Sequence, residues 1–325
     1  MTFFALVPDD LEPEGLEYLR SRPEFEVYAP GKMTREETLA QVPRAHGMIV
    51  RSGTQVDAEL LSQAPNLKVV VRAGVGVDNI DLSACTLRSV VVMNAPDGNT
   101  ISTAELAFGL MLALARHIPK ADASMRAGRW DRKLFMGMEL RGKTLGIIGL
   151  GRVGRALAER AQAFGMTELA YDPFVPERLA KHLGLPLVPQ VDELYAKADV
   201  ISLHALVTPE TEGMINAASI EKMKPGVLII NAARGKLVNS ADLAAALRSG
   251  HVRGAAIDVY DLEPPVPDNP LLGLDNVIYT PHLGASTYEA QAAVGIQAAQ
   301  QLVQYLLEGK ADNVRNKDLF DEPPI

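Results

Sequence analysis

Cysteine is almost absent from this sequence: Cys85 is the only one among 325 residues. No disulfide can form within one chain, and a zinc site built on several thiolates is excluded. The His-Glu-x-x-His pattern of helical zinc sites is absent as well, so we expect no metal. Free cysteine usually packs inside a protein, and we expect that of Cys85. Such sparing use of cysteine favours a reducing compartment, the cytoplasm.

Positive charge and long apolar runs are also scarce. The chain has 32 basic against 40 acidic residues, a net charge of −8, which disfavours non-specific binding to nucleic acid or to an anionic membrane. The first ten residues lack the basic start of a signal peptide, so we interpret them as a first strand. The apolar stretch 106–115 is too short to cross a bilayer. We therefore expect no nucleic-acid or membrane partner, and an anionic ligand needs a local cluster of positive groups.

What the sequence does contain is enough apolar material for two cores. With 325 residues and a hydrophobic content of 47%, two domains are expected. Strands that are apolar throughout are typical of parallel sheets buried on both faces, so we predict an α/β, doubly wound architecture. The first block has strand candidates at 3–7, 25–28, 47–51, 67–71 and 90–93, and the second at 144–148, 168–171, 200–204, 227–231, 255–259 and 277–280.

A glycine-rich motif, Gly149-Leu150-Gly151-Arg152-Val153-Gly154, is the strongest functional signal. It follows the apolar run 144–148 and opens a helical pattern, and Asp172 ends the next strand. In this context the glycines permit a tight turn and let the backbone approach a pyrophosphate at a helix N-terminus. Asp172 can accept hydrogen bonds from ribose hydroxyls and would repel a 2′-phosphate. We therefore predict a dinucleotide site that prefers NAD to NADP.

Two long helices are expected to connect the blocks. The first covers 100–118. The second follows the last strand, where Ser286–Glu289 fits a capping box, as Thr34–Glu37 does earlier in the chain, and it ends at Gly309. Because the first block lacks a layer over its sheet, we predict that this C-terminal helix returns to it. The substrate-binding domain would then comprise residues 1–97 and 288–325, around a dinucleotide-binding domain of residues 98–287.

An enzyme that moves a hydride to or from such a cofactor needs a group that exchanges a proton, and histidine is the commonest. His282 lies just after a strand, where open α/β sheets bind ligands, and is our candidate acid and base. Glu263 and Arg234 also follow strand ends; they could orient the imidazole and hold a substrate carboxylate, respectively. A plain surface role for each remains the alternative. For His204, at another strand end, cofactor contact and a structural role are equally open.

A second loop, 72–79, follows the strand at 67–71. Its glycines Gly74 and Gly76 would expose backbone N–H groups, which can form a nest for an anion. Arg72 adds positive charge, and Arg51 ends the neighbouring strand candidate. An ordinary tight turn with a solvated arginine is an equally open interpretation.

These segments resemble the D-isomer-specific 2-hydroxyacid dehydrogenases, and most closely the branch that oxidises 3-phosphoglycerate. The resemblance extends over nearly the whole chain. It implies a Rossmann NAD-binding domain inserted in a discontinuous, flavodoxin-like substrate domain, and a homodimer built largely on the cofactor domain. Because the candidate catalytic groups belong to one block and the anion-binding loops to the other, we also expect the cleft between them to close and exclude water. The segments that carry it most densely are 71–81, 94–105, 142–154, 231–235, 254–265 and 281–287.

The resemblance also implies roles for individual residues. His282 would accept the C2 hydroxyl proton, with Glu263 tuning it and Arg234 as the third catalytic group. The remaining assignments are of two kinds. Those implied for the cofactor are Gly149, Gly151, Arg152, Val153, Gly154, Asp172, Pro173, His204, Ala232, Arg234, Asp258, His282 and Gly284. Those implied for the substrate are Arg51, Arg72, Gly74, Val75, Gly76, Arg132 (lent by a partner subunit), Arg234 and His282.

Two segments depart from the family pattern. Lys236, Asn239 and Ser240 replace a second glycine and an Asp-Glu pair after Arg234, and Ala205-Leu206 replaces a proline-containing segment after His204. We expect NAD-dependent oxidation of 3-phosphoglycerate to 3-phosphohydroxypyruvate, the first step of L-serine biosynthesis, without a C-terminal regulatory domain. A glyoxylate or hydroxypyruvate reductase, and a non-catalytic NAD-sensing protein like the corepressors that share this fold, are the alternatives.

Overall fold

The computed structural model describes residues 2–182 and 184–319. The chain divides into two compact units: unit 1 comprises Met1–Asn99 and Ala285–Ile325, and unit 2 is the continuous stretch Thr100–Gly284. Residues 1, 183 and 320–325, which the predicted domain ranges include, lie outside the described residues.

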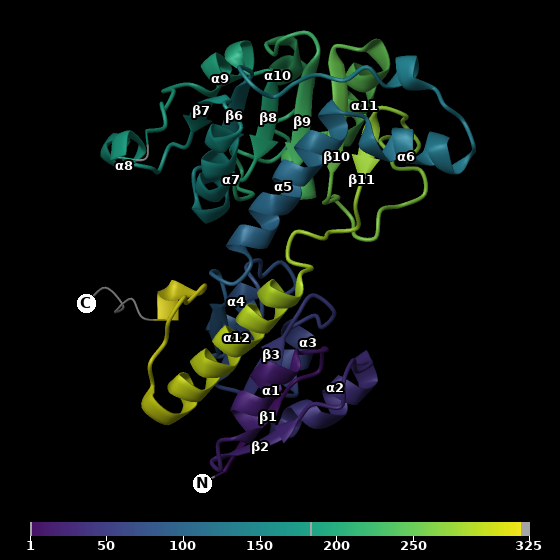
Figure 1. Cartoon of the computed structure of the whole chain (residues 1–325). Helices are drawn as coiled ribbons and strands as arrows, with labels where there is room; N and C mark the ends of the chain where they lie inside the picture. The colour runs from purple at the N-terminus through teal and green to yellow at the C-terminus, as the bar shows by residue number, and fades with distance from the viewer. Residues whose placement is uncertain (1, 183, 320–325) are drawn as a thin grey trace. The chain divides into compact units, whose positions relative to one another are not determined.

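Unit 1 is built on a parallel sheet of five strands in the order β2-β1-β3-β4-β5, the flavodoxin-like order. Its strands are β1 (Phe3–Leu6), β2 (Phe25–Tyr28), β3 (Gly47–Val50), β4 (Val69–Arg72) and β5 (Val91–Asn94). One face packs on α1 (Pro13–Arg20) and α12 (Tyr288–Glu308), and the other on α2 (Arg35–Gln41), α3 (Ala58–Ser62) and α4 (Leu82–Leu87) (Figure 1). Short 3-10 turns are η1 (Val42–Arg44) and η4 (Lys317–Leu319).

Unit 2 is built on a parallel sheet of six strands in the order β11-β10-β9-β8-β6-β7. A single bridge from Leu187 to Ala170 extends it beyond β7, so the strand-to-strand order around β6 is that of a Rossmann fold with its third strand reduced to one bridge. The strands are β6 (Thr144–Ile148), β7 (Thr167–Tyr171), β8 (Val200–Leu203), β9 (Val227–Asn231), β10 (Val252–Ile257) and β11 (Val277–Tyr279).

Helices cover both faces of this second sheet, so its strands are apolar on both sides. Successive residues of β9 alternate between the two cores: Leu228 and Ile230 join one, Val227 and Ile229 the other. The first core includes α5 (Thr100–Ala115) and α7 (Arg152–Ala163), and the second includes α9 (Val191–Lys197), α10 (Ala217–Glu221) and α11 (Ser240–Ser249) (Figure 1). The remaining elements are α6 (Ile118–Arg126), α8 (Glu177–His182), η2 (Arg132–Phe135) and η3 (Gly235–Leu237). The predicted α/β, doubly wound fold is confirmed.

The prediction of one helix over 100–118 is wrong at its end. α5 stops at Ala115, His117 adopts a left-handed conformation (φ 54°), and α6 begins at Ile118 with a proline in its first turn, where proline is favoured. Among the described residues, no individual helix is both long and apolar enough to cross a membrane; α5 and α6 meet that test only together, and they are bent by 63° at their break.

Three smaller predictions can be compared with the helix ends and the core. Thr34 and Glu37 form the capping box that the sequence predicts. The box at Ser286–Glu289 is wrong, because Thr287 is the N-cap and accepts a hydrogen bond from the Ala290 N–H. Cys85 is a free, buried thiol as expected, and burial raises its pKa to about 12.

Candidate active site

The glycine motif forms the turn between β6 and α7. Gly149 has φ 94°, and a Cβ on it would lie 2.6 Å from the carbonyl carbon of His204. A Cβ on Gly154 would lie 2.2 Å from the carbonyl oxygen of Gly149, so helix and strand can pack only with glycine there. Gly151 is the N-cap of α7 without a side-chain cap, and a Cβ on it would meet no atom within 4 Å. The backbone at Gly151 is thus open to a ligand.

Asp172 follows β7 directly beside this turn. Its carboxylate accepts hydrogen bonds from the N–H groups of Leu150 (2.8 Å) and Phe174 (2.9 Å), which fix it against the glycine motif. A cavity of about 410 Å³ adjoins it and is lined by Asp172, Pro173, Val175 and Leu187 among others. A cavity that combines an acidic group with apolar side chains suits a ligand with an aromatic ring and a hydroxylated sugar.

His204 follows β8 on the other side of the glycine motif. Its Nε2 lies 2.8 Å from the Ser202 hydroxyl, and its backbone N–H donates to Ile148. Burial lowers the pKa of His204 to about 4, so the imidazole is neutral at pH 7. The structure therefore gives this residue a packed, uncharged position at the strand end; a contact with the cofactor stays a prediction.

The loop that carries His282 is held by the carboxylate of Asp258, which is fully buried just after β10. Its Oδ1 accepts hydrogen bonds from the Thr280 hydroxyl (2.6 Å) and the Leu283 N–H (2.7 Å), and its Oδ2 accepts one from the Gly284 N–H (3.0 Å). The Asp258 carbonyl accepts the His282 N–H at 2.8 Å. Since its side chain is committed to this loop, Asp258 positions His282.

His282 and Glu263 are in direct contact. His282 takes a left-handed conformation (φ 55°), and its Nδ1 lies 2.6 Å from Oε2 of Glu263. Burial acts to raise the pKa of Glu263, but the hydrogen bond from His282, the N–H of Tyr260 and the positive charges of His282 and Arg234 outweigh it and lower the pKa. An ionised carboxylate at Nδ1 keeps the proton on that nitrogen and leaves Nε2 to exchange a proton.

Arg234 reaches the same place from β9. The buried Asn231 braces its turn: the side-chain amide donates to the Arg234 carbonyl (2.9 Å) and accepts the Ala233 N–H (3.1 Å). Gly235 lets this turn approach the Glu263 loop, because a Cβ there would lie 2.0 Å from the carbonyl carbon of Tyr260. The charge of Arg234 is near enough to lower the pKa of Glu263. The three residues proposed from sequence are therefore gathered at the ends of β9, β10 and β11.

Unit 1 presents Arg51 from a clamped turn after β3. The buried carboxylate of Asp9 accepts the Arg51 N–H (2.5 Å) and the Thr54 hydroxyl (3.0 Å). From the opposite side, the Asn79 amide donates to the carbonyls of Arg51 (2.7 Å) and Thr54 (2.6 Å). The backbone that carries Arg51 is thus fixed at both its donors and its acceptors.

Arg72, the last residue of β4, lies over the loop that begins with Gly74. Gly74 has φ 148°, and a Cβ on it would overlap the Arg72 guanidinium, at 1.4 Å from Nη1. The Asn94 amide donates to the Val75 carbonyl at 2.6 Å and holds the loop open. Across the described residues, the N–H groups of Val75 and Gly76 make no hydrogen bond, which is the donor arrangement of an anion nest.

The remaining predicted site residues lie on several different elements of unit 2. Ala232 is buried after β9, and Gly284 is held through its carbonyl by the hydroxyls of Ser102 (2.6 Å) and Thr103 (3.0 Å). Arg152 and Val153 are the first residues of α7, and Arg132 lies on η2. The sequence analysis did not single out Asp9 and Asn79, whose side chains hold the Arg51 turn; the Asp9-Asp10 pair shortly after the first strand was a signal for the former.

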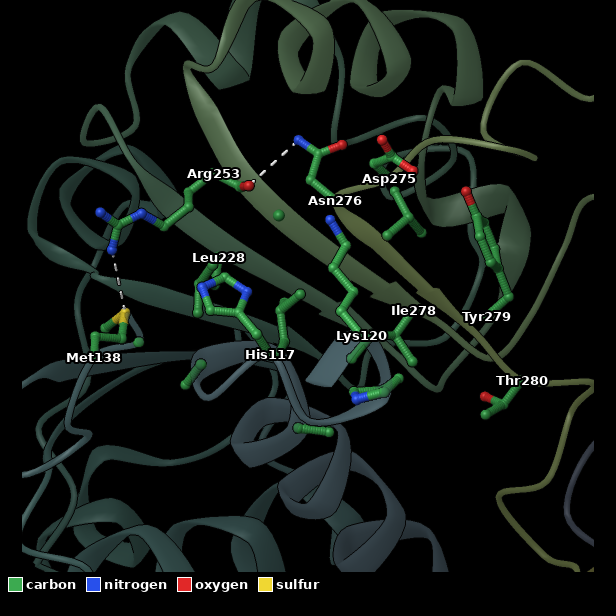
Figure 2. Close-up of a pocket in the computed structure, with 17 residues that line it drawn as sticks. His117, Lys120, Met138, Leu228, Arg253, Asp275, Asn276, Ile278, Tyr279 and Thr280 are labelled. Carbon is green, nitrogen blue, oxygen red and sulfur yellow. Dashed lines mark hydrogen bonds between the residues drawn. The ribbon is translucent and has the colours of Figure 1, made fainter. Parts of the chain in front are cut away.

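Another pocket of unit 2 lies away from these residues. It has a volume of about 490 Å³ and a mostly apolar lining between the end of α5, α6 and the edge strand β11. Figure 2 shows His117, Lys120 and Arg253 around it, with Leu228 and Ile278 among its apolar residues. It contains none of the predicted catalytic residues.

Comparison with known proteins identifies the family. Residues 108–284 match the model of the D-isomer specific 2-hydroxyacid dehydrogenase, NAD binding domain. The chain belongs to the D-isomer specific 2-hydroxyacid dehydrogenase family, as the sequence predicted, and the prediction that this part of the chain is an NAD-binding domain is confirmed.

The chain is also similar to individual proteins of known name or structure. The chain is 53% identical over 299 residues to the D-3-phosphoglycerate dehydrogenase of Archaeoglobus fulgidus, covering 92% of this chain but 56% of that protein. The chain thus spans little more than half the length of the curated relatives it matches. Among solved structures it is similar to the TT0316 protein of Thermus thermophilus (TM-score 0.87, 36% identity, 96% and 99% covered) and to a glyoxylate reductase from Paecilomyes thermophila (TM-score 0.86, 30%, 98% and 99%).

Proposed function

We propose that this protein is an NAD-dependent oxidoreductase that interconverts a D-2-hydroxyacid and its 2-ketoacid, with 3-phosphoglycerate and 3-phosphohydroxypyruvate as its substrate pair. The observation that carries the reaction class is the contact between His282 and Glu263 beside Arg234, at the same carboxyl edge of the parallel sheet as a glycine turn suited to a dinucleotide. The names of the D-3-phosphoglycerate dehydrogenase relatives support the substrate.

The residues of unit 2 fit NAD. The open backbone at Gly151 suits the pyrophosphate, and Asp172 with its adjoining cavity suits the adenosine. Two N–H donors hold the Asp172 carboxylate beside the glycine turn, so its negative charge would meet a 2′-phosphate there and repel it. When bound, the nicotinamide supplies or accepts the hydride.

The protein's own residues handle the proton and the charge. His282 takes the C2 hydroxyl proton through Nε2 as a hydroxyacid is oxidised, and returns it to the carbonyl oxygen in reduction. Glu263 stabilises the imidazolium through Nδ1. Arg234 pairs with the substrate carboxylate and polarises the adjacent carbonyl, a task for which a guanidinium has the right fork of donors.

Unit 1 supplies groups for a second anion. Arg51 and Arg72 provide positive charge, and the N–H groups of Val75 and Gly76 provide donors for the substrate carboxylate. This arrangement favours a phosphorylated hydroxyacid. A glyoxylate or hydroxypyruvate reductase is the second candidate, which the similarity to a glyoxylate reductase structure favours.

A rate panel separates the two candidates. Oxidation of NADH is followed with phosphohydroxypyruvate, hydroxypyruvate, glyoxylate, 2-ketoglutarate and pyruvate as substrates. The proposal predicts the highest kcat/KM for phosphohydroxypyruvate. A higher value for glyoxylate or hydroxypyruvate would favour the reductase, and tight NADH binding without turnover of any of these would favour the NAD-sensing alternative.

We further propose a homodimer formed through unit 2. Trp130, Leu134 and Met136 are 73%, 74% and 82% exposed, an unusual concentration of bare apolar side chains, and the apolar pocket of Figure 2 lies in the same unit. A second copy of the chain would bury both, and Arg132 on this segment is our candidate for a residue lent to the partner's site. Light scattering should give a dimer mass for the wild type and a monomer for Leu134→Asp; a monomeric wild type would contradict the proposal.

A cytoplasmic location stays a prediction.

A further inference from the structure

One side chain connects the predicted phosphate-binding arginine to a distant part of the chain. Gln291, in the first turns of α12, accepts a hydrogen bond from Nη2 of Arg51 through its Oε1 and donates one from its Nε2 to the Ala285 carbonyl. All three residues belong to unit 1. Ala285 is three residues beyond His282 in the chain, so the amide joins the backbone that leads out of the His282 loop to the Arg51 side chain.

These two hydrogen bonds determine which way the amide points. A carbonyl oxygen can only accept, so the Ala285 carbonyl requires the –NH₂ group of Gln291, and the Arg51 guanidinium, which can only donate, requires its oxygen. The remaining neighbours of the guanidinium are local: the Asp10 carbonyl at 3.3 Å from Nη1 and a Glu12 carboxylate oxygen at 3.5 Å. Within the described residues, Gln291 is the partner of the Arg51 guanidinium that comes from outside the loop after β1.

The partner that α12 provides is neutral. A guanidinium has five N–H donors. Within the described part of the chain, the Arg51 guanidinium donates hydrogen bonds to the Asp10 carbonyl and to Gln291. Donors therefore remain for a bidentate contact with an anion. Arg51 already faces the Glu12 carboxylate at 3.5 Å. An amide orients the arginine without adding a second negative charge, whereas a carboxylate in its place would add one and compete with the ligand.

We propose that Gln291 is a positioning residue that fixes Arg51 for the phosphate of the substrate and so contributes to the preference for phosphorylated over unphosphorylated 2-ketoacids. This inference rests on the proposed function. It assigns no contact with substrate to Gln291; the residue acts through Arg51.

The test compares Gln291→Met and Gln291→Glu with a matched control, Gln297→Met. Gln297 lies on the same helix and binds Asp97 at 2.9 Å rather than an arginine. Steady-state rates are measured with phosphohydroxypyruvate and with hydroxypyruvate. Losing one charge-assisted hydrogen bond should raise KM for phosphohydroxypyruvate about tenfold in Gln291→Met, with kcat and the hydroxypyruvate parameters little changed. Gln291→Glu should raise it further, because its carboxylate neutralises Arg51 and repels the phosphate. Gln297→Met should match the wild type.

A double-mutant cycle with Arg51→Met shows whether Gln291 acts through the arginine. If it does, Gln291→Met has no further effect on phosphohydroxypyruvate once Arg51 is replaced. Equal loss with both substrates, or an equal effect of Gln297→Met, would overturn the inference in favour of a structural role. If Arg51→Met discriminates between the substrates and Gln291→Met does not, the inference fails and the proposed function stands. If Arg51→Met itself does not discriminate, the proposed phosphate site fails, and the inference with it.

Discussion

The two units use the same geometry for different purposes. Each places its charged residues on loops after the carboxyl ends of parallel strands, yet the groups differ. In unit 2 the loops bring together His282, Glu263 and Arg234, with His282 and Glu263 2.6 Å apart, and we propose that this histidine exchanges the proton. In unit 1 they carry Arg51, Arg72 and the N–H groups of Val75 and Gly76, which we propose as the groups that bind anions.

The way the loops are held differs as well. In unit 2, a single buried carboxylate, Asp258, collects three donors from the His282 loop. In unit 1, the turn at Arg51 is clamped between Asp9 and Asn79, while the arginine's side chain is steered by Gln291. Both units thus hold the backbone of the loop, and the difference lies in the side-chain partner: His282 contacts the carboxylate of Glu263, whereas Arg51 contacts the neutral amide of Gln291. Substitutions in the two units test this difference.

The largest expected effect is the loss of the proton-exchanging group. His282→Gln should lower kcat by about 10²–10⁴ for every 2-ketoacid, because general acid–base catalysis contributes about that factor. Binding of NADH, measured by fluorescence titration, should change little. Near-full turnover in this variant would show that another group exchanges the proton.

Asp258→Asn tests the carboxylate that holds the His282 loop. Three donors lose an ionised acceptor, so the free energy of unfolding should fall by about 3 kcal/mol. Urea titration provides the measurement, with the exposed Asp268→Asn as control. Equal stabilities of the two variants would mean that the loop does not depend on Asp258.

Gly235→Ala tests the close approach that brings Arg234 to Glu263. The new Cβ would lie 2.0 Å from the Tyr260 backbone, so one of the two loops must move, and a displacement of about 1 Å can cost about 100-fold in kcat. Gly109→Ala, inside α5 with no atom within 4 Å of its Cβ, should keep wild-type kcat. If Gly235→Ala were as active as Gly109→Ala, the juxtaposition of the two loops would not matter.

His204 allows a smaller, pH-dependent test. The pKa of His204 is about 4 in the folded protein, below the ordinary 6.5. Between these two pH values the unfolded chain binds more protons at this histidine than the folded protein does, so the free energy of unfolding decreases as the pH falls. From pH 7 to pH 5 this should cost about 2 kcal/mol of unfolding free energy. His204→Asn should lose that part of the pH dependence, whereas the exposed His182→Asn should keep it. Identical pH profiles for both variants would contradict the assignment.

The elements that could be predicted from sequence are those determined by local pattern. The strands at Phe25–Tyr28, Thr144–Ile148 and Val227–Asn231 were predicted to the residue, because each is an apolar run bounded by polar or turn residues. The break at His117 was missed, since nothing local forbids a helix there and only the proline at 119 suggests a new start. The capping prediction at Ser286 failed because Thr287, next to it, is an equally good cap.

The residues of the candidate site also fall into those that local sequence spacing predicts and those that depend on contacts distant in the sequence. The glycine motif and Asp172 depend on spacing within one strand–turn–helix unit, so sequence suffices to propose them. The position of Arg51 depends on Asp9, which holds its backbone, and on Gln291, which contacts its side chain; they are 42 and 240 residues away. Such contacts are determined by tertiary packing, and the periodicity of the sequence does not predict them.

The most direct test of the contrast between the units is one table of kcat and KM for wild type, His282→Gln and Arg51→Met, with phosphohydroxypyruvate and hydroxypyruvate as substrates. We predict that His282→Gln lowers kcat for both substrates by a similar factor, while Arg51→Met mainly raises KM and does so far more for the phosphorylated one. The account would be contradicted if Arg51→Met affected both substrates alike, or if His282→Gln spared either of them.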